Sequence, residues 1–315
     1  MNFKEFRARY QKCEIKHYPS KVQEKPLLSV IVQTYNHERF ISQCLNSILK
    51  QKTNFPFEIL LGEDTSKDTT RIICQKYAHR FPEKIRLFLH HPNNKIHILG
   101  VPTGNFNAIY NLFQAKGRFI AFCEGDDIWQ DPLKLQKQVD LLLVNPNIAF
   151  NYHSFIEVNE NEEPLPIDKI LDQPVFPIDR NELKTLTYHP LLSTVCFRNY
   201  FIEGIPEEFP EVINVDSFLI SLLGNYGTAE YMKNITPSYY RRHEGGIWSG
   251  RIKELKLRSK ILTFQQLSSY YRKQREHRME NHFNSLIKET SRILLLSYLR
   301  EYQPQKAFRL LKTLF

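Results

Sequence analysis

The stretch Phe119-Ile-Ala-Phe-Cys-Glu-Gly-Asp-Asp127 joins an apolar run to a dense acidic cluster. Five consecutive apolar residues predict a parallel strand that is buried on both faces of a sheet. Glu124, Asp126 and Asp127 then lie just beyond the carboxyl end of that strand, where open α/β sheets bind ligands. The stretch therefore predicts an α/β fold with a polar site at one sheet edge.

The acidic cluster has the composition of a site for a hard divalent cation. Mn²⁺ and Mg²⁺ take carboxylate oxygens together with phosphate oxygens and water. Gly125 allows a tight turn between the acids. By itself the segment is equally compatible with an acidic loop that caps a helix beginning near Pro132.

Composition sets the broad class. The 315 residues, 42% of them hydrophobic and 13% aromatic, indicate a globular protein with a large core. No apolar run reaches the roughly 18 residues of a membrane span, and the polar start does not resemble a signal peptide, so we expect a cytoplasmic protein. The five cysteines are odd in number and scattered, which predicts reduced thiols. A net charge of +9 favours an anionic partner: nucleotide, lipid headgroup or nucleic acid.

Strand-like and helical patterns alternate through the first half of the chain. Strands are predicted at residues 27–32, 57–61 and 85–89, and helices over residues 40–49, 69–80 and 108–115. This order predicts a mainly parallel sheet with helices on both faces and right-handed crossovers.

Three ordered motifs carry a family resemblance. Ser29–Asn36, Glu58–Asp64 with Ser66 and Asp68, and Glu124–Asp127 resemble the signatures of family 2 glycosyltransferases. The resemblance covers residues 27–150, with weaker matches to about residue 250. It implies a GT-A fold, a nucleotide-diphosphate sugar donor, a divalent metal, and transfer with inversion at the anomeric carbon.

The resemblance also implies residues that bind the nucleotide. Thr34, Tyr35 and Asn36 follow the first strand, and Asp64 follows the second. A tyrosine ring can stack on a base and a carboxylate can accept the imide hydrogen of uracil, so we expect UDP. Tyr35 as a core aromatic and Asp64 as a helix cap remain alternatives, although Ser66 or Asp68 stands closer to the next helix.

Two positions depart from the family pattern. Glu63 stands where paired aspartates are usual, and Glu124 stands where the metal motif often begins with aspartate. Each keeps its charge on a longer side chain, which alters ribose or metal geometry. Glu124 and Asp126 are still expected to contact the nucleotide, and Asp126 and Asp127 the metal.

The loop at residues 99–107 precedes a helix and resembles the segment that lines the donor site, with Asn105 as its candidate contact or a turn residue. No glycine-rich dinucleotide fingerprint follows the first strand, which disfavours a nicotinamide enzyme.

The family supplies its general base well downstream of the metal motif. Asn214-Val-Asp-Ser-Phe-Leu219 resembles that segment, with Asp216 at a helix start. Asp216 is the candidate base or a plain N-cap. The acid that often precedes it is here Val215. His153 and His189 are interpreted as structural.

Residues 240–248, Tyr-Arg-Arg-His-Glu-Gly-Gly-Ile-Trp, resemble a loop that closes over the donor diphosphate. Arg241 and Arg242 can neutralise phosphate. His243 can ligate metal or contact a phosphate oxygen. Gly245 and Gly246 form a hinge, and Trp248 shields the closed site from water.

We divide the chain into an extension (1–26), a nucleotide-sugar-binding half (27–150), an acceptor-binding and catalytic half (151–250) and a basic helical extension (251–315). The last part is amphipathic and basic enough to rest on an anionic membrane, or it is a helical cap or a dimer contact.

Taken together, the family resemblance and the acidic cluster imply an inverting, metal-dependent glycosyltransferase. It would move sugar from a UDP-sugar to a glycan or lipid-linked acceptor in bacterial surface polysaccharide synthesis. The alternatives are a sugar nucleotidyltransferase, whose glycine-rich, lysine-bearing loop is missing, and a noncatalytic nucleotide- or nucleic-acid-binding module, which leaves the acidic cluster unexplained. We expect no nucleic-acid partner.

Overall fold

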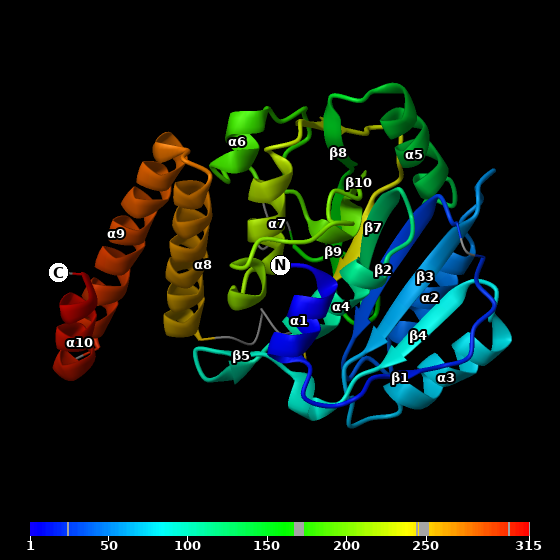
Figure 1. The fold of residues 1–315 in the computed structure, drawn as a ribbon, viewed down its shortest axis with the longest axis horizontal. Coiled ribbons are helices and arrows are strands. Elements are labelled where there is room, and N and C mark those ends of the chain that lie inside the picture. Colours follow the sequence, from blue (N-terminus) through cyan, green and yellow to red (C-terminus); the bar gives the residue numbers. More distant parts are fainter. Residues whose placement is uncertain (24, 167–172, 244, 246–251, 302, 315) are drawn as a thin grey trace.

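Four apolar strands form the centre of the sheet in the computed structural model (Figure 1). They are β2 (Leu28–Thr34), β3 (Phe57–Glu63), β4 (Ile85–Leu89) and β7 (Phe119–Glu124). All four run parallel in the order β4-β3-β2-β7, and nearly every side chain on them is buried, as sheets covered on both faces require. The structure describes all residues except 24, 167–172, 244, 246–251, 302 and 315.

Four further strands widen this sheet to the order β1-β4-β3-β2-β7-β10-β8-β11. β1 (Lys16–His17) pairs antiparallel with β4, β10 (Cys196–Arg198) lies antiparallel between β7 and β8 (Ile148–Tyr152), and β11 (Thr228–Tyr231) runs parallel to β8. Two small ribbons pair β9 (Phe155–Val158) with β12 (Ser238–Arg241) and β5 (His97–Ile98) with β6 (Val101–Pro102). The mostly parallel sheet expected from the sequence is confirmed.

Residues 191–197 have the composition of a strand but do not form a single one. A 3-10 turn, Leu192–Thr194, precedes β10. The turn brings the Ser193 carbonyl to the indole N–H of Trp129, which donates to it at 2.9 Å, and the Ser193 hydroxyl to Asp127. Polar contacts to the β7 loop therefore override the strand pattern here.

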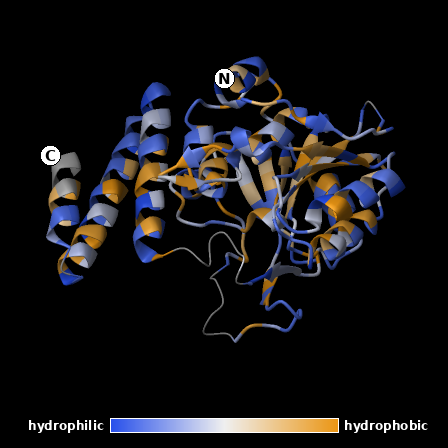
Figure 2. Ribbon diagram, turned by 90° about the horizontal axis from the view of Figure 1, so that it is seen from below, coloured by the Kyte–Doolittle hydropathy of each residue, from blue (hydrophilic) through white to orange (hydrophobic). Residues whose placement is uncertain are grey.

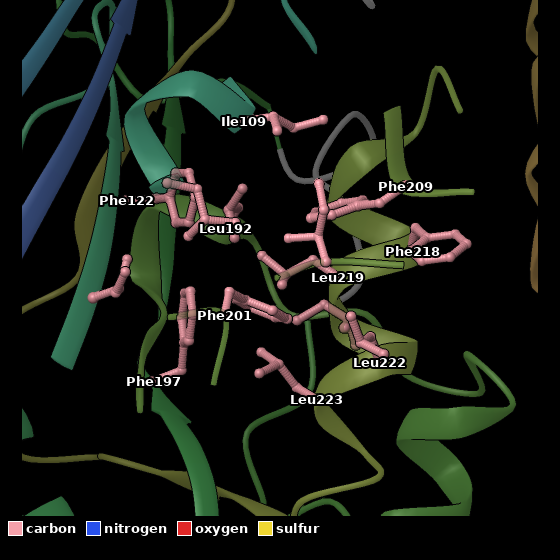
Figure 3. Packing of buried hydrophobic residues seen from close by; sticks show 14 of the residues in the cluster. Ile109, Phe122, Leu192, Phe197, Phe201, Phe209, Phe218, Leu219, Leu222 and Leu223 are labelled. Carbon is pink, nitrogen blue, oxygen red and sulfur yellow. The ribbon is translucent and has the colours of Figure 1, made fainter. Parts of the chain in front are cut away.

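Helices cover both faces of the sheet because its strands alternate buried side chains to either side. α2 (Ile41–Leu49), α3 (Thr70–Arg80) and α5 (Lys134–Val144) pack on the face that Val30 and Val32 enter. α1 (Phe3–Tyr10), α4 (Asn105–Gln114), the short α6 (Arg180–Lys184) and α7 (Val215–Leu223) pack on the Ile31 face. Figure 3 shows part of this second cluster, where Leu219 of α7 points toward Phe122 and Phe197 of the sheet.

The first residues pack against the α/β core. Phe6 of α1 is fully buried and stacks on Phe106 of α4 with ring centroids 5.3 Å apart. The amino group of Met1 donates to the Ile205 carbonyl at 2.7 Å. All five cysteines are free thiols, as expected.

Three helices form the C-terminal extension beside the sheet (Figures 1 and 2). They are α8 (Lys253–Lys273), α9 (His277–Arg300) and α10 (Pro304–Leu314). The Tyr271 hydroxyl of α8 donates to the Ser221 carbonyl of α7 at 3.0 Å, which ties the extension to the core. Among the described helices, none has the length and apolar character needed to cross a membrane.

Candidate active site

The loop after β2 is held in a left-handed turn. Asn36 has φ 55°, a conformation that asparagine adopts more readily than most residues. Its backbone N–H donates to the Ser66 hydroxyl at 3.0 Å, and its side-chain oxygen accepts from the Lys67 N–H at 2.8 Å. These bonds join the first and second predicted motifs, and Tyr35 stands between Asn36 and the end of β2.

Asp64 lies at the end of β3 with its carboxylate in an ion pair. Its N–H donates to the Thr34 carbonyl at 3.0 Å, and its Oδ2 is 2.9 Å from Lys95 Nζ. The same ammonium lies 3.9 Å from the ring centroid of Tyr35. Burial raises the pKa of Asp64 to about 6, against the opposing charge of Lys95.

The helix-capping role falls to another acid. Asp68 Oδ1 accepts from the Thr70 N–H at 3.0 Å, so Asp64 is not the cap of α3. Glu63 accepts from the Ser66 N–H at 2.6 Å and pairs with Arg71 at 2.5 Å. Of the two acids that end this motif, Asp64 is the one paired with a lysine beside Tyr35.

The acidic turn after β7 requires glycine at its centre. The Gly125 N–H donates to the Gln33 carbonyl at 2.9 Å, and the Asp127 N–H donates to the Glu124 carbonyl at 3.0 Å. A Cβ on Gly125 would lie 2.8 Å from the Gln33 carbonyl oxygen and from His37 Nδ1. The tight turn expected at this glycine is confirmed.

Two histidines converge on Asp126. His243 Nε2 is 3.0 Å and His37 Nε2 is 3.7 Å from Asp126 Oδ2. The three ligand atoms lie within 4.8 Å of one another, and these are the described residues that could jointly hold a metal ion. Burial alone would raise the pKa of Asp126, but the adjacent His37 and His243 rings outweigh it and hold that pKa below its usual range.

Both carboxylate oxygens of Asp127 accept hydrogen bonds from other residues of the protein. Its Oδ2 accepts from the Ser193 hydroxyl and its Oδ1 from the Arg241 N–H at 3.2 Å. Burial, together with the charge of Asp126, raises its pKa well above the usual range. Asp127 therefore ties the β7 turn to β12, and its predicted contact with metal stays a prediction.

Glu124 begins the acidic turn, at the carboxyl end of β7. Burial is the main cause that raises the pKa of Glu124, and the charges of Asp126, Asp127 and Asp216 add to it. Gln33 Nε2 stands 3.5 Å from Glu124 Oε1. The charge of Asp216 thus adds to the electrostatics of the acidic turn.

Asp216 is the second residue of α7, and 44% of its side chain is exposed. Its Oδ1 accepts from the adjacent Ser217 N–H at 2.8 Å, and its Oδ2 lies 3.7 Å from His189 Nε2. The Ser217 hydroxyl is 3.2 Å from the same histidine nitrogen. An exposed carboxylate with a histidine beside it can serve as a general base.

The two arginines that were predicted to bind phosphate already contact other groups of the protein. Arg241 is buried, and its guanidinium donates to the carbonyls of Asp126 at 3.0 Å and Glu160 at 2.9 Å and to Gln43 Oε1 at 2.8 Å. Arg242 pairs with the buried Glu157 and keeps 35% of its side chain exposed.

Asn105 is buried and its amide donates to the carbonyls of Pro210 and Val212. It therefore ties α4 to the segment before α7. Of the predicted closing loop, Gly246 and Trp248 lie outside the described residues.

Four side chains at this site were missed or set aside in reading the sequence: His37, Lys95, His189 and Ser193. His37 directly follows the first motif, which is a signal that could have been used. His189 was interpreted as structural, yet it lies beside Asp216. His153, also interpreted as structural, is buried with Nδ1 2.8 Å from the Ser154 carbonyl oxygen.

The mostly parallel sheet, with carboxylates gathered beyond its strand ends, defines a GT-A-like α/β protein. The sequence model described as Glycosyl transferase family 2 matches residues 29–201. The chain belongs to this family, which confirms the resemblance in the motifs and supports a transferase over a nucleotidyltransferase or a noncatalytic module.

Individual relatives agree with this membership. An uncharacterized protein of Mycobacterium bovis is 32% identical over 226 residues, covering 70% of this chain and 60% of that relative. The Escherichia coli UDP-Glc:alpha-D-GlcNAc-diphosphoundecaprenol beta-1,3-glucosyltransferase WfgD is 30% identical over 244 residues, covering 75% of this chain and 85% of WfgD. The crystal structure of S. aureus TarS 1-349 in complex with UDP-GlcNAc has the same fold, with a TM-score of 0.51, 19% identity and 90% of each chain covered.

Proposed function

We propose that this protein transfers a sugar from a UDP-sugar to a hydroxyl group of a glycan or lipid-linked acceptor, with inversion, in bacterial surface polysaccharide synthesis. The observation that carries the proposal is the arrangement of three carboxylates. Asp64 follows β3 and Asp126 follows β7, and these two strands flank β2 in the sheet. The charge of Asp216 on α7 contributes to the raised pKa of Glu124 in the acidic turn. The name of WfgD, a UDP-glucose-dependent enzyme with a lipid-linked acceptor, supports the donor and acceptor classes.

The nucleoside would bind at the β2–β3 end of the site. Tyr35 offers a ring for stacking, and Asp64 offers a carboxylate for the imide hydrogen of uracil. Lys95 now pairs with Asp64 at 2.9 Å, so it sits where it can hold the carboxylate in place. Thr34 Oγ1 is buried and has no hydrogen-bond partner among the described residues, which leaves it open to a ligand. Asn36 keeps the loop in its turn.

The diphosphate would bind above the acidic turn. Asp126 and His243 offer ligand atoms 3.0 Å apart for Mn²⁺ or Mg²⁺, and Asp127 is a further candidate. When bound, such a cation neutralises the charge that grows on the departing diphosphate. Arg242, the more exposed of the two arginines, would contribute to the same charge balance, and Arg241 holds the loop. Glu124 and Asn105 remain proposed contacts of the donor.

Asp216 would act as the general base. It removes the proton from the acceptor hydroxyl, whose oxygen then bonds to the anomeric carbon while the bond from that carbon to the phosphate oxygen breaks. UDP leaves with the bonding electron pair, and the single displacement inverts the anomeric configuration. His189, 3.7 Å from Asp216, would orient the carboxylate.

An anionic membrane surface fits a lipid-linked acceptor. Residues 253–315 contain 14 Lys and Arg against five Asp and Glu, so their net charge of +9 equals that of the whole chain. Ile293, Leu296 and Leu299 of α9 are exposed on this basic part. Basic helices with exposed apolar side chains bind anionic bilayers, and flotation of the protein with phosphatidylglycerol vesicles, but not with neutral ones, tests this point.

Release of UDP from a panel of UDP-sugars tests the function directly. Purified protein is assayed with Mn²⁺, with Mg²⁺ and with chelator. Asp216→Asn should lower turnover by about 10²- to 10⁴-fold, the usual contribution of a general base, and retain donor binding. Asp140→Asn, an exposed acid on α5, is the matched control and should keep full activity. Absence of turnover with every UDP-sugar and every metal would reject the UDP donor.

A further inference from the structure

His37 is held in place from three sides. Its backbone N–H donates to the Thr70 hydroxyl at 2.8 Å. Its Nδ1 is buried against Gly125, where an added Cβ would approach to 2.8 Å, and has no hydrogen-bond partner among the described residues. The other ring nitrogen, Nε2, lies 3.7 Å from Asp126 Oδ2.

The facing histidine is fixed in a similar way. The His243 ring packs on Phe40 with centroids 4.8 Å apart and meets the His37 ring edge-on at 5.8 Å. Its Nε2 lies 3.0 Å from Asp126 Oδ2. The two imidazoles therefore present nitrogen atoms to a single carboxylate from segments that are far apart in the sequence.

The spacing of these three atoms suits an ion. Ligand atoms about 2.1 Å from an octahedral ion are about 3 Å apart when adjacent and about 4.2 Å apart when opposite. The separations of 3.0 and 3.7 Å, with all three atoms within 4.8 Å, come close to that range. Small rotations of the side chains would complete the geometry.

We propose that His37 is a direct ligand of the divalent cation together with Asp126 and His243, and that this two-imidazole, one-carboxylate set makes the site select Mn²⁺ over Mg²⁺. The inference rests on the cation of the proposed function and decides which ion it is. Mg²⁺ binds mainly through oxygen and loses its water ligands reluctantly. Mn²⁺ also takes oxygen ligands, but as a transition ion it accepts imidazole nitrogen more readily than Mg²⁺ does. Co²⁺, later in the same series, is expected to bind more tightly than Mn²⁺.

Calorimetric titration with the metal alone, and with metal in excess UDP, measures the selectivity. The full-length wild type should bind Mn²⁺ at least about tenfold more tightly than Mg²⁺. Loss of a mere outer-shell partner already costs about 10- to 100-fold in metal affinity. Loss of a direct ligand through His37→Ala should therefore weaken Mn²⁺ binding by at least about tenfold. His37→Gln, which keeps the side-chain volume and offers oxygen, should reduce the preference for Mn²⁺. His277→Ala, an exposed histidine of α9, is the matched control and should bind like the wild type.

A spectroscopic measurement separates a ligand from a merely supporting residue. Electron spin-echo modulation of bound Mn²⁺ reports nitrogen from coordinated imidazole. The wild type should show two imidazoles, and His37→Gln and His243→Gln should each show one, with melting temperatures recorded to confirm folding. Two imidazoles in folded His37→Gln, or unchanged Mn²⁺ affinity in folded His37→Ala, would overturn the role of His37 and leave the proposed function intact. Wild type that binds no divalent ion, with or without UDP, would overturn both this inference and the metal in the proposed function.

Discussion

Recognition of uracil by Asp64 should depend on pH in a range set by burial. The carboxylate is nearly inaccessible, with 7% of its side chain exposed, and its pKa is raised to about 6. The ionised carboxylate accepts the imide hydrogen in a charge-assisted bond, which is stronger than the bond to a neutral carboxyl. Affinity for the nucleoside should therefore rise as pH increases through 6 and level off above it.

The size of the effect follows from that pKa. About one tenth of a group with a pKa near 6 is ionised at pH 5, and nearly all of it at pH 7.5. Affinity should therefore fall by up to about tenfold from pH 7.5 to pH 5, which is about 1.4 kcal/mol. Asp64→Asn replaces a charge-assisted hydrogen bond with a neutral one, a loss of about 1 kcal/mol at pH 7.5, and its affinity should no longer change with pH.

Uridine is the appropriate ligand because it has no phosphate that titrates in this range. Ligand-observed NMR titrations of the metal-free protein at pH 5, 6 and 7.5 give its dissociation constant. Cytidine, which lacks the imide hydrogen, should bind weakly throughout, and Asp140→Asn should follow the wild-type profile. Uridine affinity that is flat in folded wild type, or an unchanged pH dependence in Asp64→Asn, would refute the assignment of Asp64.

Three further predictions concern other parts of the molecule. Gly125→Ala forces a Cβ to 2.8 Å from the Gln33 carbonyl oxygen, so it should lower the free energy of unfolding by about 1–3 kcal/mol. Urea denaturation measures this loss, and an unchanged midpoint would contradict the close packing. His189→Ala should lower kcat while leaving donor KM unchanged, because His189 lies beside Asp216 rather than beside the nucleoside residues. Equal changes in KM and kcat would argue for a role in donor binding. Arg86→Met leaves the fully buried Glu58 without the guanidinium that stands 3.0 Å away, and should cost about 3–5 kcal/mol of stability. Arg86→Met combined with Glu58→Gln should recover part of that loss. No recovery would show that the pair does not act as a unit.

Several local features follow from short stretches of sequence. The strand before Glu124 and the glycine turn after it are confirmed because an apolar run and a glycine act over a few residues. Asp68, rather than Asp64, holds the start of α3, as its position next to the helix predicts. The parallel order of the central strands follows from the alternation of strand and helix.

The partner that each polar side chain contacts comes from a segment far away in the sequence. His243 meets Asp126 at a sequence separation of 117 residues, and Lys95 reaches Asp64 from the loop after β4. Arg241 and Asn105 have the residue types of anion and donor contacts, yet their donors are taken up by backbone carbonyls.

The sequence by itself determined the family, the α/β class and the strand ends at which the acids stand, since hydrophobic period, turn residues and motif order are local properties. Only the tertiary structure decided which of those acids face a histidine, a serine or an arginine. A buried polar atom takes whichever partner the crossing of distant segments brings within hydrogen-bond distance, and neither residue type nor spacing specifies that crossing.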